Sequence, residues 1–154
     1  MSIRTFLLII CIIPLRIEAQ SSGGSILEVQ QLNPINISYD NIDALMQDVR
    51  VDNAFQVTVQ PQKTRCQLYA QLVFNDPATP APPASCLLLK LRTVNHMSVN
   101  TAEVPLSLTP ARVSDIEPSQ NPTILNYDVV VKSQQSMSNI GLHNFTINFT
   151  IVQP

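Results

Sequence analysis

Few side chains in this sequence have the types and spacing that catalysis or ligand binding requires. The two histidines, His96 and His143, belong to no HExxH or other metal-ligand spacing. The three glycines, Gly23, Gly24 and Gly141, cannot form a phosphate-binding loop, and no GxSxG nucleophile turn occurs. The sequence therefore predicts a protein that is not an enzyme and that uses no cofactor.

A mild cluster of acidic and amide side chains lies at Asp40, Asn41, Asp43, Asp48 and Asp52. Carboxylate and amide oxygens are the ligands that Ca²⁺ prefers. The cluster lacks the spacing and the glycine of an EF-hand loop, and Asp and Asn are also ordinary residues of turns. The turn interpretation is favoured, and no metal site is predicted.

Residues 1–19 have the features of a cleavable signal peptide. Arg4 supplies a positive charge, and the apolar run from Phe6 to Ile13 ends at Pro14. This run has the length of a signal-peptide core, whereas a membrane-spanning helix needs about 20 apolar residues, so cleavage is favoured over the alternative of a retained, uncleaved anchor. Ala19 is the small residue expected before the cut. We therefore predict export to the periplasm, the cell surface or the extracellular space, with membrane contact only through the signal peptide before cleavage.

Export determines how the cysteines are interpreted. Cleavage removes Cys11 and leaves Cys66 and Cys86 in an oxidising compartment, where a pair normally forms a disulfide. In the chain-entropy model, closing a loop of about 20 residues stabilises the fold by roughly 3 kcal/mol. No metal ligand or catalytic base is close to either cysteine in sequence, so a structural disulfide between Cys66 and Cys86 is predicted.

Three Asn-x-Ser/Thr sequons, at Asn36, Asn144 and Asn148, are possible glycosylation sites. A chain this rich in Asn, Ser and Thr contains about two such sequons by chance, so they are also compatible with an unmodified protein.

The chain is organised as one domain behind a short tail. Residues 20–25 are small and polar and predict a flexible N-terminal tail, and residues 26–154 are long enough for one domain with a core. The formal net charge is −2, and no basic stripe occurs. Nucleic-acid binding is therefore not expected.

Period-two alternation of apolar and polar residues predicts short strands along the domain. The clearest is Phe145 to Ile151, where Asn148 and other polar residues alternate with the apolar ones. A strand at Val104 to Leu108 is expected at a sheet edge, because Pro105 cannot donate a ladder hydrogen bond. The remaining expected strands are Ile26–Val29, Ile35–Tyr39, Phe55–Val59, Leu68–Phe74, Leu87–Leu91 and Tyr127–Val131.

Polar or proline-rich connections separate these strands. Asn75 to Ser85 and Ser114 to Thr123 are expected as long loops, and Asp40 to Val51 could hold at most one short helical turn. Seven or eight short strands with such connections predict an all-β fold, a single immunoglobulin-like antiparallel β-sandwich.

The C-terminal pattern resembles the closing hairpin of bacterial secreted pilin-like and adhesin-like sandwich domains. The similar segments are Tyr127 to Lys132, Ile140 to Leu142 and Asn144 to Ile151. The Ala19-Gln20 junction is similar to signal cleavage sites of Bacteroidetes-type bacteria. The chain departs from chaperone–usher pilins at Ile26 to Leu32, which does not form a long alternating N-terminal extension. The order of three earlier segments also fits such domains: Phe55–Val59, Leu68–Ala70 and Val104–Leu108.

These observations predict a non-catalytic surface or extracellular structural or adhesion domain, which the resemblance extends to a pilin-like fibre subunit. Its expected partner is another protein, or a second copy, on the cell surface. The alternative is a secreted module that binds a glycan or another small molecule. Sugar sites commonly present aromatic rings, and the tyrosines available for such a site are Tyr39, Tyr69 and Tyr127.

Overall fold

The computed structural model describes residues 8–9, 26–35, 38–39, 47–60, 64–74, 86–133 and 145–153. All regular elements in this part of the chain are β-strands, and nine of the eleven form two antiparallel sheets packed face to face as a sandwich. The all-β sandwich predicted from the sequence is therefore confirmed.

The larger sheet has six strands in the order β2-β4-β10-β6-β7, and β8 pairs with β6 beside β7. Every pairing in it is antiparallel. Its strands are β2 (Ile26–Gln31), β4 (Val49–Gln60), β6 (Leu87–Val94), β7 (Met97–Ser98), β8 (Val104–Pro105) and β10 (Thr123–Val131).

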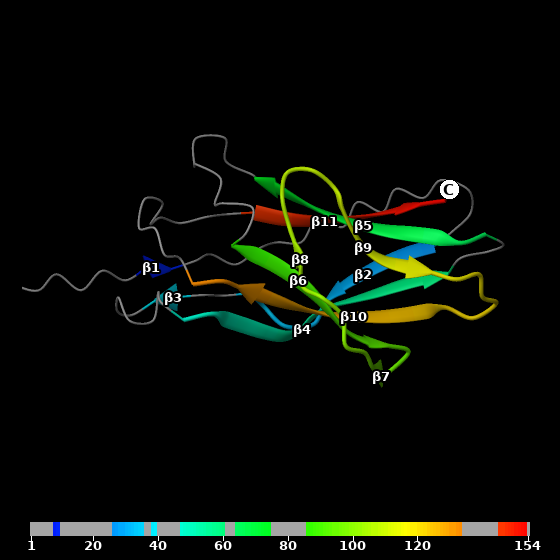
Figure 1. The fold of residues 1–154 in the computed structure, drawn as a ribbon, viewed down its shortest axis with the longest axis horizontal. Helices are drawn as coiled ribbons and strands as arrows, with labels where there is room; N and C mark the ends of the chain where they lie inside the picture. The colour runs from blue at the N-terminus through cyan, green and yellow to red at the C-terminus, as the bar shows by residue number, and fades with distance from the viewer. Residues whose placement is uncertain are drawn as a thin grey trace, which may run out of the picture.

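The smaller sheet has three strands in the order β11-β5-β9. They are β5 (Cys66–Phe74), β9 (Ala111–Ile116) and β11 (Phe145–Val152). Figure 1 views the sandwich from the side, with β5, β9 and β11 in one layer and β4, β6 and β10 in the other. A separate pair joins β1 (Leu8–Ile9) to β3 (Ser38–Tyr39).

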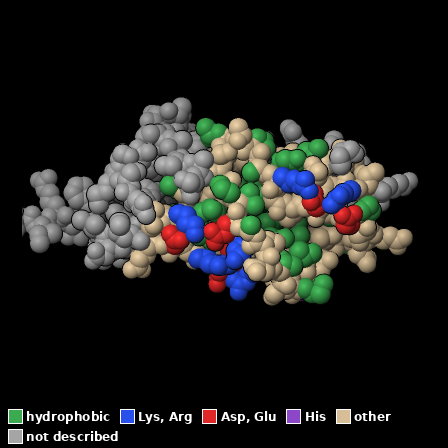
Figure 2. Space-filling model, in the orientation of Figure 1, with side chains coloured by type: hydrophobic (Ala, Val, Ile, Leu, Met, Phe, Trp, Pro, Cys, Tyr) green, Lys and Arg blue, Asp and Glu red, His purple; other side chains and the backbone are tan. Residues whose placement is uncertain are grey.

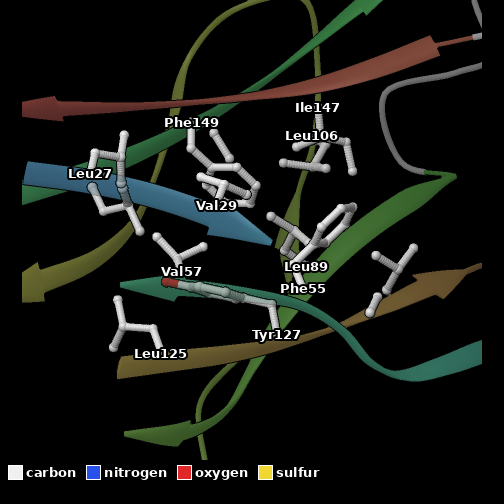
Figure 3. Close-up of a cluster of buried hydrophobic side chains, with 14 of the residues drawn as sticks. Leu27, Val29, Phe55, Val57, Leu89, Leu106, Leu125, Tyr127, Ile147 and Phe149 are labelled. Carbon is white, nitrogen blue, oxygen red and sulfur yellow. The ribbon is translucent and has the colours of Figure 1, made fainter. Parts of the chain in front are cut away.

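The core lies between the two layers because alternate residues of each strand turn inward. The ring of Phe149 on β11 lies 5.9 Å from that of Phe55 and 6.0 Å from that of Tyr127, so aromatic contacts join the sheets (Figure 3). The other labelled members of this buried cluster are Leu27, Val29, Val57, Leu89, Leu106, Leu125 and Ile147.

One extended segment crosses from the larger sheet to the smaller one. The Leu106 N–H donates to the Leu87 carbonyl at 2.8 Å and continues the ladder of β8 with β6. One residue later, the Ser107 carbonyl accepts from the Leu72 N–H at 2.8 Å, which begins the contact with β5. Leu106 itself is fully buried. This crossing closes one side of the sandwich.

A partly buried hydrogen bond also ties the layers together. The Tyr127 hydroxyl on β10 lies 2.6 Å from the Ser114 hydroxyl on β9. Burial raises the pKa of the Tyr127 phenol far above its ordinary value, although the bond to Ser114 acts in the opposite direction. The phenol therefore stays neutral and serves as a hydrogen-bonding group.

Several strand predictions are confirmed, and others need correction. The alternating C-terminal strand and the edge position of Pro105 are as expected. Ile35 is buried but lies outside the strands, and residues 36–37 fall outside the described part. Val49 to Val51 belong to β4 and form no helical turn. The expected Ser114 to Thr123 loop loses its first residues to β9, because Ser114 to Ile116 pair with β5.

The tail at residues 20–25 and the loop at residues 75–85 lie outside the described residues. No helix in the described part of the chain is long and apolar enough to cross a membrane.

Candidate functional site

A buried carboxylate forms the centre of a polar network that joins β4, β6 and β10. Asp128 is fully buried on β10, between Tyr127 and Val129 of the core. The Arg50 guanidinium from β4 donates to Asp128 Oδ2 through Nε at 3.1 Å and through a second nitrogen. The Asn53 N–H donates to Asp128 Oδ1 at 2.8 Å, so backbone and side-chain donors hold the same carboxylate.

Arg92 and Asp52 complete this network, which we call the Asp128 cluster and define as Arg50, Asp52, Arg92 and Asp128. Arg92 Nη1 lies 3.5 Å from Asp128 Oδ1 and 3.0 Å from Asp52 Oδ1. Asp52 Oδ1 also lies 3.0 Å from Arg50 Nε. Each arginine therefore contacts both acids, one of which is buried and the other exposed.

An irregularity in β4 brings these groups together. Tyr127 pairs with Phe55 and Val129 pairs with Val51, so Asp128 faces the three residues between them on β4. Asn53 has a left-handed backbone with φ of 48°, a conformation that Asn tolerates better than most residues. This bulge turns the Asn53 N–H toward Asp128.

A second side chain grips the same bulge from the end of β2. Asn33 Nδ2 donates to the Asp52 carbonyl at 2.8 Å and to the Asn53 carbonyl at 3.3 Å. The Leu32 N–H donates to the Ala54 carbonyl at 2.9 Å. The bulge is therefore held by hydrogen bonds with β10 on one side and with the end of β2 on the other, as expected for a specific structural feature of the sheet.

The electrostatics of the cluster keep Asp128 ionised. Burial raises the pKa of the Asp128 carboxyl, but the hydrogen bonds from Arg50 and the Asn53 N–H, with the charges of Arg50 and Arg92, outweigh it. The pKa therefore lies below its ordinary value. The pKa of Arg50 is raised, chiefly by its hydrogen bond to Asp128, and that of Arg92 chiefly by its bond to Asp52.

Two further ion clusters lie at other places on the surface. Lys132 Nζ lies 3.0 Å from Asp48 and 3.1 Å from Glu103, and the Ser133 N–H donates to Asp48 at 2.7 Å. The bond from the Ser133 backbone, followed by that from Lys132, lowers the pKa of Asp48. Figure 2 shows charged side chains of both signs gathered in two groups on the face in view.

The other cluster surrounds Asp115 on β9. Arg112 pairs with Asp115, and Arg65 lies 3.8 Å from Asp115 and 3.1 Å from Glu117. Acids and bases neutralise each other in this group, as they do around Asp128. Among the described residues, no group of three or more His, Cys, Asp or Glu side chains could hold a metal ion.

The acidic residues singled out in the sequence do not come together as a group in the described chain. Asp48 binds Lys132, and Asp52 binds Arg50 and Arg92. Residues 40–46, which hold the other members of that cluster, lie outside the described residues, as does His143. His96 lies in the turn between β6 and β7 with φ of 67°.

The predicted Cys66–Cys86 disulfide is absent from the structure, and the topology explains why. Leu72 of β5 is hydrogen-bonded to Ser107, and Leu87 of β6 is hydrogen-bonded to Leu106. Because Leu106 and Ser107 are adjacent, the end of β5 lies near the start of β6. Cys86 is next to Leu87 at the start of β6. Cys66 lies six residues before Leu72 on an extended strand, so it is about 20 Å from Leu72 and from that end of the sandwich. A disulfide needs Cα atoms within about 7 Å.

The disulfide prediction was wrong because β5 and β6 run in opposite directions. Cys66 at the start of β5 and Cys86 just before β6 therefore lie at opposite ends of the sandwich. Cys66 is buried, and its sulfur lies 3.6 Å from the Thr64 carbonyl and 3.9 Å from Gln153 Nε2. Cys86 is half-buried, and burial raises the pKa of its thiol.

Of the three predicted sequons, one falls within the described part of the chain. Asn148 lies on β11 opposite Gln71 of β5 and is half-buried. Its strand neighbours Ile147 and Phe149 are buried in the core, so Asn148 itself is on the outer face of the smaller sheet. Asn36 and Asn144 lie outside the described residues.

The same outer face carries a half-buried tyrosine. Tyr69 pairs across the sheet with Thr150 on one side and Arg112 on the other. Its hydroxyl donates to Gln67 Oε1 at 3.0 Å. Tyr127 is instead buried in the core, and the side chain of Tyr39 is outside the described part.

The sequence analysis missed the Asp128 cluster. Its signal was a single acid inside the apolar run of β10 and an Asp-Asn pair inside the alternating run of β4. An acid at such a position is costly unless it is paired, so the sequence alone implies a basic partner for Asp128.

Comparisons with known protein families, with curated proteins and with solved structures found no match.

Proposed function

We propose that this chain is an exported, non-catalytic structural or adhesion domain that acts through contacts with other proteins on the cell surface or outside the cell. In this proposal it is a subunit of a fibre or an adhesive layer, with an immunoglobulin-like sandwich of the kind found in bacterial pilin-like and adhesin-like domains. The resemblance of its terminal strands to those domains supports this assignment.

The observation that carries the proposal is the way the buried polar groups are used. A general acid or base works best with a pKa near the working pH and with access to the substrate. Asp128 has a lowered pKa and is locked under two arginines. The Tyr127 hydroxyl is occupied by Ser114 between the sheets. Asp128 joins three strands of the larger sheet, and Tyr127 joins that sheet to the smaller one, so both groups serve the structure, as a scaffold requires.

The test is to isolate the exported chain and to determine its assemblies and partners. Size-exclusion chromatography and negative-stain microscopy should show assemblies, or cross-linking at the surface of the producing cell should recover a defined protein partner. A strictly monomeric chain with no cross-linked protein partner would contradict the proposal.

The position of Tyr69 favours a second candidate, a module that binds a glycan. A tyrosine on an outer sheet face, beside the amide side chains of Gln67 and Gln71, offers a ring for stacking and groups for hydrogen bonds to sugar hydroxyls. A glycan array should then give hits that Tyr69→Ala removes. An array without hits would dismiss this candidate.

A further inference from the structure

The outer side of β11 is an open sheet edge in the described chain. β11 pairs along its whole length with β5, and no other described strand pairs with it. An edge strand leaves half of its backbone N–H and C=O groups without a ladder partner. These groups can template pairing with another strand.

β11 carries none of the features that usually prevent such pairing. Its sequence, Phe-Thr-Ile-Asn-Phe-Thr-Ile-Val, has no charged residue and no proline. Its register with β5 runs without a break from Phe145 opposite Phe74 to Val152 opposite Gln67. Charges, prolines and bulges are the common protections of edge strands, and β11 carries none of the three.

The other edges of the two sheets each carry a protection. On β9 there are the charges of Arg112 and Asp115 and a break in register. Pro105 lies on β8, Glu28 lies on β2, and β7 has two residues. The contrast within one molecule singles out β11.

The two faces of β11 suit extension by an equivalent strand. Ile147, Phe149 and Ile151 are buried against the core, and Asn148 and Thr150 turn to the outer face. A second β11 placed antiparallel beside the first, by a two-fold axis perpendicular to the sheet, keeps apolar residues over apolar ones and polar beside polar. Because the strand is uncharged, it meets its own copy without like-charge repulsion.

We propose that β11 pairs antiparallel with β11 of a second copy, which joins the two smaller sheets into one continuous sheet of order β9-β5-β11-β11-β5-β9. The interface is isologous, since each copy contributes the same strand. This inference rests on the proposed function and names its partner as the chain itself.

The test compares two matched double substitutions in the full exported chain. Asn148→Lys with Thr150→Lys places charges on the outer face of β11, where the two copies bring them close together. The control, Gln56→Lys with Thr58→Lys, places the same charges on the outer face of β4, which is paired on both sides by β2 and β10.

Sedimentation equilibrium should show a dimer of the unmodified chain at about 0.5 mM, the weak end of specific association. The β11 variant should weaken dimerisation at least about tenfold, and the β4 control should leave it unchanged. Far-UV circular dichroism checks that both variants fold.

Hydrogen exchange on the unmodified chain supplies a second measurement that needs no variant. Alternate amides of β11 should gain protection as the protein concentration rises, while those of β9 and β2 should not. A chain that stays monomeric at about 0.5 mM, or a dimer that the β11 variant forms equally well, would overturn the inference. A monomer that still cross-links to a different surface protein would leave the proposed function standing.

Discussion

The Asp128 cluster allows a quantitative prediction, because one buried and one exposed acid contact the same two arginines. Replacing Asp128 by Asn keeps the shape of the side chain and removes its charge. The new amide oxygen can still accept from the Asn53 N–H, but the amide nitrogen then faces the donors of Arg50, which leaves donors unpaired. Asp128 is 0% exposed, so water cannot compensate.

The magnitude follows from what each partner loses. Hydrogen bonds to charged groups contribute roughly 1.5–3 kcal/mol each, and breaking a buried ion pair from one side typically costs about 3–5 kcal/mol. The side chains of Arg50 and Arg92 are 43% and 39% exposed and can regain water. We therefore expect Asp128→Asn to lower the free energy of unfolding by about 3 kcal/mol.

Asp52→Asn is the matched control. Asp52 lies 3.0 Å from both Arg50 and Arg92, but its side chain is 59% exposed. Exposed ion pairs contribute less than about 1 kcal/mol. Urea unfolding followed by far-UV circular dichroism measures both variants, since the chain has no tryptophan for fluorescence. Equal losses for Asp128→Asn and Asp52→Asn, or a loss under about 1 kcal/mol for the former, would refute the reasoning.

The remaining predictions concern acid stability, the bond between the sheets and the cysteines. The folded pKa values of Asp128 and Asp48 lie below the ordinary 3.8, so the unfolded chain binds more protons in acid. Stability should therefore fall as the pH drops from that value toward the lower folded pKa values. Urea midpoints between about pH 5 and pH 3 should fall less for Asp128→Asn than for the unmodified chain. Tyr127→Phe should cost about 1–2 kcal/mol because it removes the partner of the half-buried Ser114 hydroxyl. Tyr69→Phe on the outer face should cost under about 1 kcal/mol, and equal urea midpoints for the two variants would contradict this. Non-reducing peptide mapping of the exported chain should find no peptide pair joined through Cys66 and Cys86, and a native thiol reagent should label the half-buried Cys86 faster than the buried Cys66; a recovered Cys66–Cys86 peptide would show that the strand directions are wrong.

The strands with clean alternation could be predicted from the sequence because burial on one face leaves a period of two. Ile147, Phe149 and Ile151 on β11 follow this rule. The two-residue β7 and the charged β9 could not be recognised, because β7 is too short to show a period and β9 alternates poorly. β4 was recognised only from Phe55 onward, because its bulge at Asp52 and Asn53 interrupts the alternation.

The pairing of distant residues was the harder part of the prediction. Asp128 contacts Arg50 across 78 positions of the sequence, and no local pattern encodes that contact. The disulfide prediction failed for a related reason. Spacing along the chain suggested that Cys66 and Cys86 were close, whereas strand direction decides their distance in space.

The placement of β2 and β11 also determines how the domain responds to mechanical force. Ile26 begins β2 opposite Gln60, and Val152 ends β11 opposite Gln67, with only a short connection between β4 and β5. Ile26 and Val152 therefore lie at the same end of the sandwich. Ladder hydrogen bonds run perpendicular to the strands, so a pull that separates Ile26 from Val152 loads them one after another. The domain should peel open at low force from this end, whereas a partner strand along β11 would add a second row of bonds to be broken.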